Sequence, residues 1–384
     1  MLSCQKHEFS LPPGLHYLNC AYMSPLPQRV EAAGIAGVRR KRVPSAITPE
    51  DFFAGADQVR ALFAGMVNVA DAGRIAIVPA VSYGLAAVAR NTPIGGGRNV
   101  VVSREQFPSN VHVWRSACRR GGGEVRVIGP PVDGPGRGKA WNEALVDAID
   151  GNTAVVALPV LHWTDGTRFD LERIGERARE VGAALVVDGT QSVGALPFDV
   201  EQIRPDALVC AGYKWLLGPY SLGVAYLGPR FDAGEPLEET WTGRAGSEDF
   251  RALVQYREEY RPLAARYDVG EPSNFALMPM LEAGLGLVLE WGVANIQDYC
   301  ASLSGPLAEG ARALGFTVED PAWRGAHLLG LRLPAGADVA ALARSLQERD
   351  VAVSVRGNSL RVAPHVYNDE SDVQALLDAL SEHA

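Results

Sequence analysis

Short apolar runs alternate with segments of helical periodicity through most of this 384-residue chain. The apolar runs have the length of β-strands, and we predict strands at 75–78, 99–102, 124–127, 154–158, 184–187, 207–210 and 223–227. Helical spacing lies between them, at 81–89, 111–119 and 171–181. This order of elements predicts an α/β fold with a mostly parallel sheet that helices cover on both faces.

The pattern changes after about residue 270. A long helical region at 278–303 leads into a compact block, with predicted strands at 328–333, 351–355 and 359–362 and helices at 339–347 and 371–380. We therefore expect an N-terminal segment and a large domain at 1–270, and a linking helix with a small α+β domain at 271–384. Because sites in open α/β sheets lie at the carboxyl ends of strands, the residues directly after each strand are the first functional candidates.

Charge and cysteine content exclude several classes of protein. The chain has 36 basic and 45 acidic residues and a net charge of −9, whereas a nucleic-acid-binding protein needs a basic face. Its 5 cysteines are scattered without a CxxC pair, which argues against a zinc site or a disulfide framework and favours a reducing compartment. Residues 1–12 lack the apolar core of a signal peptide, and no apolar run is long enough to cross a bilayer. We expect a soluble cytoplasmic protein with no metal, membrane or nucleic-acid partner.

Lysine is scarce, since only Lys6, Lys41, Lys139 and Lys214 occur among the 36 basic residues. Codon bias accounts for the scarcity, but any chemistry that needs an amine has only these side chains. Lys214 follows the predicted strand 207–210 and lies between two aromatic residues. Apolar surroundings disfavour the charged form of an amine and lower its pKa, which makes it a nucleophile. The alternative is a lysine that extends to the surface beside a tryptophan.

A carboxylate closes another predicted strand. Asp188 directly follows the run 184–187 and precedes a polar turn, Gly189-Thr190-Gln191-Ser192. An ordinary strand-end carboxylate is one interpretation, and a nucleotide-hydrolysing site is excluded because no GxxxxGK[ST] sequence occurs. An amine and a carboxylate at neighbouring strand ends suit pyridoxal phosphate, whose aldehyde reacts with a lysine and whose pyridine nitrogen is kept protonated by an aspartate.

Two further parts of such a site have candidates. The cofactor's phosphate needs a helix N-terminus, and Val81 and Ser82 open a predicted helix directly after strand 75–78. Its ring needs an aromatic face, and Phe107 follows strand 99–102. Core packing is the alternative interpretation for Phe107.

The segments "VVDGTQSVGALPFDV" and "CAGYKWLLGPYSLG" resemble the pyridoxal-phosphate-dependent aminotransferase class V family. This fold-type I group includes cysteine desulfurases, kynureninases and isopenicillin N epimerase-like proteins. The resemblance extends from "HYLNCAYMSPLP" to "LRVAPHVYNDESDV" and so covers nearly the whole chain. It implies a large domain around a mostly parallel sheet and a small C-terminal α+β domain.

The resemblance also implies a role for each matched residue. Lys214 forms the Schiff base with the cofactor and later moves the substrate's α-proton, Asp188 pairs with the pyridine nitrogen, and Gln191 reaches the ring's phenolic oxygen. The other cofactor contacts are Phe107 and Asn110 beside the ring and Val81, Ser82 and Tyr213 at the phosphate. The substrate contacts are Arg361 at the α-carboxylate, Trp163 above the ring, and Asn19, for which a plain turn asparagine is the alternative. Trp241, Ser273 and Asn274 match positions that reach a neighbouring subunit's cofactor, which implies a homodimer with shared sites.

Departures from the family pattern narrow the reaction. Desulfurases carry a nucleophilic cysteine shortly before the carboxylate-binding arginine, but 340–360 contains none, which argues against persulfide chemistry. The segment "FPSN" places Asn110 where kynureninases have an acid. Our first hypothesis is an aminotransferase acting on an amino acid. A kynureninase-like or C–S lyase or hydrolase, and an epimerase, use the same α-deprotonation and stay open.

Two hypotheses come from other classes. The first is a pyridoxal-phosphate-binding scaffold without turnover, against which the joint presence of Lys214, Asp188 and Arg361 counts. The second is an NAD-dependent dehydrogenase, which rests only on "PIGGGR", a segment without GxGxxG spacing.

Overall fold

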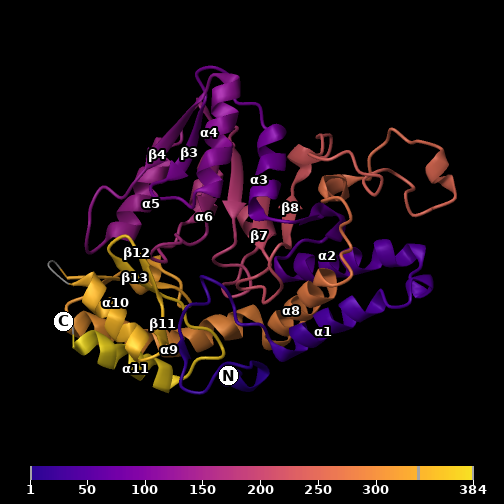
Figure 1. Ribbon diagram of the computed structural model, residues 1–384. Helices are drawn as coiled ribbons and strands as arrows, with labels where there is room; N and C mark the ends of the chain where they lie inside the picture. Colours follow the sequence, from indigo (N-terminus) through magenta and orange to yellow (C-terminus); the bar gives the residue numbers. More distant parts are fainter. Residues whose placement is uncertain (1, 335–337, 383–384) are drawn as a thin grey trace.

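A central seven-stranded sheet organises the computed structural model, which describes residues 2–334 and 338–382 (Figure 1). Its strands, in spatial order, are β2 (Ile75–Val78), β8 (Gly223–Leu227), β7 (Ala207–Ala211), β6 (Ala184–Asp188), β5 (Thr153–Pro159), β3 (Asn99–Ser103) and β4 (Glu124–Ile128). Neighbours from β7 to β4 are parallel, whereas β8 runs antiparallel to both β2 and β7. The predicted strands and the mostly parallel sheet are confirmed.

Helices cover both faces of this sheet, which explains why its strands are continuously apolar. Every residue of β2, β3, β5, β6, β7 and β8 is buried, and only the edge strand β4 is partly exposed. On one face pack α3 (Val81–Arg90) and α4 (Ser109–Gly121). On the other pack α2 (Ala54–Met66), α5 (Arg137–Ala148) and α6 (Leu171–Glu180). The short α7 (Val200–Ile203) joins β6 to β7.

Within the described residues, four α-helices lie where no helix was predicted: α1 (Gln28–Arg40), α2, α5 and the short α7. Glycine and alanine residues interrupt the apolar periodicity of α1 and α2, so the sequence shows only a weak helical pattern there. The third, α5, begins directly after Gly136, inside a glycine- and proline-rich stretch that is typical of a loop.

The C-terminal part has a four-stranded antiparallel sheet in the order β12 (Ser354–Arg356), β13 (Ser359–Val362), β10 (Leu329–Arg332) and β9 (Thr317–Val318). The helices α10 (Val339–Glu348) and α11 (Glu370–Ser381) accompany it, as predicted. The predicted strand at 351–355 is wrong in its extent, because β11 (Val351–Ala352) and β12 join different sheets.

The expected single helix at 278–303 is two helices, α8 (Leu277–Trp291) and α9 (Val293–Ala313), which are bent by 72°. Gly292 makes the corner with a φ of 79°, a conformation that favours glycine. Within the described ranges, no single helix is long and apolar enough to cross a bilayer. Only α8 and α9 taken together have that length and composition, and they form a bent pair.

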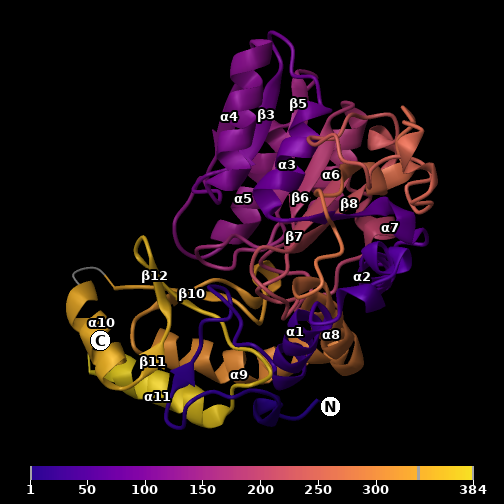
Figure 2. The same ribbon diagram turned by 45° about the vertical axis from the view of Figure 1, so that its right-hand side comes forward.

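The N-terminal segment lies against the C-terminal part (Figure 2). Strand β1 (His16–Tyr17) pairs in parallel with β11, and Asn19 forms a bridge with Ala363. Leu18 belongs to the same apolar core as β10 and β13. We retain the division at residue 270 as a proposal, with this segment packed on the second part.

Candidate active site

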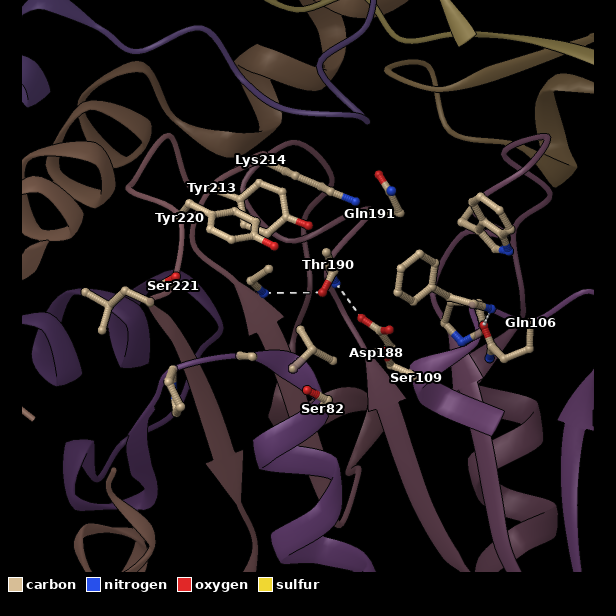
Figure 3. Close-up of a pocket in the computed structure, with 18 of the residues that line it drawn as sticks. Ser82, Gln106, Ser109, Asp188, Thr190, Gln191, Tyr213, Lys214, Tyr220 and Ser221 are labelled. Carbon is tan, nitrogen blue, oxygen red and sulfur yellow. Dashed lines mark hydrogen bonds between the residues drawn. The ribbon is translucent and has the colours of Figure 1, made fainter. Parts of the chain in front are cut away.

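A cavity of about 350 Å³ opens where β5, β6 and β7 end and β8 begins (Figure 3). It collects residues from distant parts of the sequence that were predicted separately. The predicted residues that line it are Val81, Ser82, Phe107, Trp163, Asp188, Gln191, Tyr213 and Lys214.

Lys214 lies in the turn between β7 and β8 and is only 6% exposed. Burial lowers the pKa of its amine to about 8, and the positive charge of Arg361 acts in the same direction. Gly212 makes the turn possible, since a Cβ there would lie 2.6 Å from the carbonyl oxygen of Leu222. The amine is therefore held away from water and is partly neutral near physiological pH.

Asp188 ends the neighbouring strand β6, and burial raises the pKa of its carboxyl. The backbone N–H of Thr190 donates to Asp188 Oδ1 (3.0 Å), while Thr190 Oγ1 accepts from the backbone N–H of Ala211 (3.2 Å). Figure 3 shows both bonds, which link the end of β6 to the end of β7. Thr190 thus holds the carboxylate in place relative to the strand that leads to Lys214.

The N-terminus of α3 forms the floor of the cavity. Its N-cap residue, Ala80, has no side chain that bonds to the first turn, and Val81 and Ser82 of that turn line the cavity. The ring of Tyr220 packs against that of Tyr213 at a tilt of 60°, with 4.8 Å between their centroids. Helix N-termini bind anions, so this floor suits a phosphate.

An aromatic pair closes one side. The rings of Phe107 and Trp163 meet edge to face at 5.4 Å, and Trp163 Nε1 donates to the carbonyl oxygen of Glu105 (2.6 Å). Phe107 is 39% exposed, so its ring lies open for stacking and core packing does not explain it. Lys214 Nζ lies 5.9 Å from the centroid of that ring.

Gln191 lines the cavity, but its side-chain amide is already bonded. Its Nε2 donates to the carbonyl oxygen of Ala21 (3.0 Å), and its Oε1 accepts from Trp215 Nε1 (3.1 Å). Because the amide Nε2 carries two N–H groups, its second one stays available for the predicted contact with a ring oxygen.

Asn110 is not among the residues that line the cavity, and its predicted place beside the ring stays a prediction. Its side chain is fully buried, and its Oδ1 accepts from Trp114 Nε1 (2.9 Å) one turn further along α4. Successive residues of a helix point about 100° apart, and it is Ser109 that lines the cavity.

Arg361, on β13, is 1% exposed and lies next to the cavity, against the backbone of the lining residue Trp163. Its Nη1 donates to the carbonyl oxygen of Trp163 (3.0 Å), whereas its buried Nε and Nη2 have no partner. Burial lowers the pKa of this guanidinium to about 10, and the charge of Arg356 adds to the effect. An incoming carboxylate would satisfy both unpaired nitrogens. Asn19 lies beside the same hairpin, where its Oδ1 accepts from Ser354 Oγ (2.9 Å).

Trp241, Ser273 and Asn274 do not line the Lys214 cavity. They line a separate cavity of about 710 Å³, where Asn274 Oδ1 accepts from the backbone N–H of Leu277 at the start of α8 (2.9 Å). Their predicted contact with a partner subunit's cofactor stays a prediction.

Several cavity residues were not predicted, chiefly Gln106, Ser109, Thr190, Tyr220 and Ser221. Gln106 and Ser109 flank Phe107 and could have been found as its neighbours. Tyr220 and Ser221 precede a strand, and the antiparallel direction of β8 brings its first residue, not its last, to the functional edge.

The family model for "Aminotransferase class-V" matches residues 46–376. An uncharacterized aminotransferase, YcbU, of Bacillus subtilis (strain 168) is 29% identical over 322 residues, 83% of this chain and 81% of that protein. The isopenicillin N epimerase of Amycolatopsis lactamdurans is 28% identical over 414 aligned positions, 98% of this chain and 97% of that protein.

The fold is also that of a solved structure, a C-DES variant with glycine covalently linked to its pyridoxal phosphate cofactor. The TM-score is 0.86 at 19% identity, with 99% of this chain and 100% of that one covered. The family match covers most of the chain and includes Asp188, Lys214 and Arg361. The chain therefore belongs to the aminotransferase class-V family of pyridoxal-phosphate-dependent enzymes.

Proposed function

We propose that this protein is an aminotransferase in which Lys214 removes and returns the α-proton of an amino-acid substrate. One observation carries the proposal: a buried amine of lowered pKa and a buried carboxylate share a cavity, and a buried guanidinium with two unpaired nitrogens lies beside it. Burying each of these polar or charged groups costs free energy, and a ligand that pairs with the group would offset that cost.

The residues present fit pyridoxal phosphate. Lys214 would bind its aldehyde, Asp188 would accept a hydrogen bond from its protonated pyridine nitrogen, and Val81 and Ser82 would hold its phosphate at the start of α3. A protonated ring nitrogen would relieve the cost of the buried carboxylate at Asp188. When bound, the cofactor supplies an electron sink for the charge that deprotonation leaves on the substrate's Cα.

Arg361 orients the substrate. Its Nε and Nη2 accommodate the two oxygens of an α-carboxylate, and its Nη1 stays bonded to Trp163. The exposed ring of Phe107 and the indole of Trp163 exclude water from one side of the cavity. Lys214, on the turn after β7, then acts on the α-proton as a base of suitable pKa.

A single base favours transamination, in which one side chain can take a proton and return it elsewhere on the same face. The cavity-lining side chains with an amine, carboxyl or phenol group are Lys214, Asp188, Tyr213 and Tyr220, and burial raises the pKa of Tyr213. With Asp188 assigned to the ring nitrogen, Lys214 is the base among the described residues. None of the described cysteines lines the cavity, which gives no support to persulfide chemistry.

Epimerisation is the second candidate, because the isopenicillin N epimerase matches over almost its whole length. It requires a second proton donor on the opposite face, for which Tyr213 and Tyr220 are the nearest hydroxyls to test. A C–S lyase or kynureninase-like reaction starts with the same proton removal, and only its product distinguishes it from transamination.

Exchange of the α-proton in D₂O, followed by product analysis, distinguishes these reactions. We expect exchange with retention of configuration, and an oxo-acid product only when an amino-group acceptor is present. Racemic product without an acceptor would establish epimerisation, and a cleaved side chain would establish a lyase. No exchange with any amino acid would contradict the proposal. We also propose a homodimer, to be tested by sedimentation, with Trp241, Ser273 and Asn274 at its interface.

A further inference from the structure

A second cavity, of about 470 Å³, lies behind Trp163. The two cavities are lined by adjacent residues of the same two segments. Gln106 and Phe107 line the first and Arg104 and Glu105 the second, while Trp163 and its neighbour Thr164 are divided in the same way. The Trp163 side chain, bonded to the carbonyl oxygen of Glu105, therefore lies at the boundary between them.

Several arginines line this second cavity. Two of them are already neutralised, since Arg137 pairs with Asp165 (2.8 Å) and Arg332 lies 3.6 Å from Glu319. Arg104 and Arg356 have no carboxylate partner within the described ranges. The remaining cavity carboxylates are exposed: Glu105, and Asp133, which lies 3.8 Å from Arg137.

Arg356 lines the second cavity and also lies close to Arg361. In the hairpin of β12 and β13, Ser354 pairs with Arg361 and Arg356 pairs with Ser359. Cross-strand partners and residues two apart share a face, so Arg356 and Arg361 project from the same face as diagonal neighbours, roughly 7 Å apart. The Arg356 guanidinium lies 5.7 Å from the centroid of the Trp163 ring, whose carbonyl binds Arg361.

Trp163 thus contacts two guanidinium groups. That of Arg361 has free donors for the α-carboxylate, and that of Arg356 faces the second cavity. The charge of Arg356 also reaches the base, where it adds to the lowering of the pKa of Lys214 by burial and Arg361. A substrate with one carboxylate would leave Arg356 without a counter-charge, whereas a second anionic group on its side chain would supply one.

We propose that Arg356, together with Arg104, binds an anionic group on the side chain of the substrate, so that the enzyme acts on amino acids with acidic side chains. This inference rests on the proposed function and names its substrate class. The shared chemistry is an anion at the end of a short side chain, either a carboxylate or a phosphoryl group.

Calorimetric titration of the holoenzyme with unreactive analogues tests the inference without turnover. We expect glutarate to bind about tenfold or more tightly than valerate, because a charge-assisted pair adds stabilisation that the neutral end lacks. Arg356→Gln should reduce that ratio to about one without changing valerate binding. Arg361→Gln should weaken both ligands equally, and Arg344→Gln, an exposed arginine of α10, should change neither.

Titration with phosphonopropionate in place of glutarate distinguishes a phosphoryl group from a carboxylate as the bound anion. Binding of either ligand more tightly than valerate supports the inference. Equal binding of glutarate and valerate to the unaltered enzyme would overturn it. So would an unchanged ratio in Arg356→Gln, or an Arg356-dependent affinity for inorganic phosphate alone, which would make the cavity a separate anion site. Arg356→Lys, which keeps the charge, should retain part of the preference and guards against a folding defect.

Comparison of α-proton exchange rates for glutamate and norvaline separates this inference from the function. Exchange with equal kcat/KM for both would sink the inference and leave the proposed function intact. Absence of exchange with every amino acid would sink the function, while the calorimetry would still report on Arg356.

Discussion

The end of the large sheet and the β12–β13 hairpin contribute to one site in different ways. Lys214 and Asp188 follow fully buried strands, and the turn that carries Lys214 is closed by two backbone bonds of 2.8 Å, from Gly212 to Leu222 and from Gly218 to Gly212. The hairpin is short, Val355 within it is 37% exposed, and Arg361 has two unpaired nitrogens. The sheet holds the reactive groups through its own bonds, whereas the hairpin leaves two nitrogens of Arg361 without a partner among the described residues.

This difference predicts that changes at the sheet edge abolish the chemistry, while changes on the hairpin alter which substrate binds and how tightly. Lys214→Ala is expected to have the largest effect, a loss of about 10²–10⁴-fold or more in kcat, because it removes the base as well as the cofactor's attachment. Steady-state kinetics checks it, with Lys139→Ala, at a residue 65% exposed, as the matched control. Unchanged kcat in Lys214→Ala would remove the basis of the comparison.

Arg361→Gln is expected to have the next largest effect, and of a different kind. Loss of a buried charged pair should raise KM on the order of a hundredfold and change kcat little. The same kinetics measured across a series of amino acids checks the split. A loss confined to kcat would mean that Arg361 takes part in the chemical step, and it would contradict the role of Arg361 in substrate binding.

The pH dependence of cofactor attachment probes the coupling between the two regions. With the pKa of Lys214 at about 8, the neutral amine increases as pH rises through 8, so apoenzyme should react with added pyridoxal phosphate roughly tenfold faster per pH unit below that value and then level off. Arg361 is one cause of the low pKa, so Arg361→Gln should move the midpoint to higher pH. Absorbance-monitored rates provide the measurement. A midpoint that stays the same in the variant would show that the hairpin does not act on the base.

Ser354→Ala should have the smallest effect. It removes the bond from Ser354 Oγ to Asn19 Oδ1 and loosens the hairpin against the N-terminal segment at a cost of about 1 kcal/mol. We expect a KM increase of a few fold with kcat unchanged, measured on the substrate identified by proton exchange. A fall in kcat instead would mean that Asn19 takes part in the chemistry.

The same contrast explains how much could be predicted from the sequence. The seven strands of the large sheet, and with them Asp188 and Lys214, follow from apolar runs that burial on both faces makes continuous. Strands β1 and β9 have two residues each, too few to give a pattern. The corner at Gly292 was missed because the apolar periodicity continues on both sides of it.

Other parts of the site depend on tertiary contacts that no local pattern carries. The bonds of Gln191 to Ala21 and Trp215 connect residues far apart in the chain. The burial of Asn110 against Trp114 depends on the rotation of α4 about its axis. Arg356 was not predicted at all, because its relation to Arg361 follows from the register of the hairpin.

Mapping of the borohydride-reduced protein by mass spectrometry tests the central claim most directly. Of the four lysines in the chain, Lys6, Lys41, Lys139 and Lys214, only Lys214 is buried in the cavity with an amine pKa near 8. The purified protein should be yellow, and reduction should leave a single phosphopyridoxyl group, on Lys214. A colourless protein that takes up no cofactor, or an adduct on any of the other three lysines, would contradict the account.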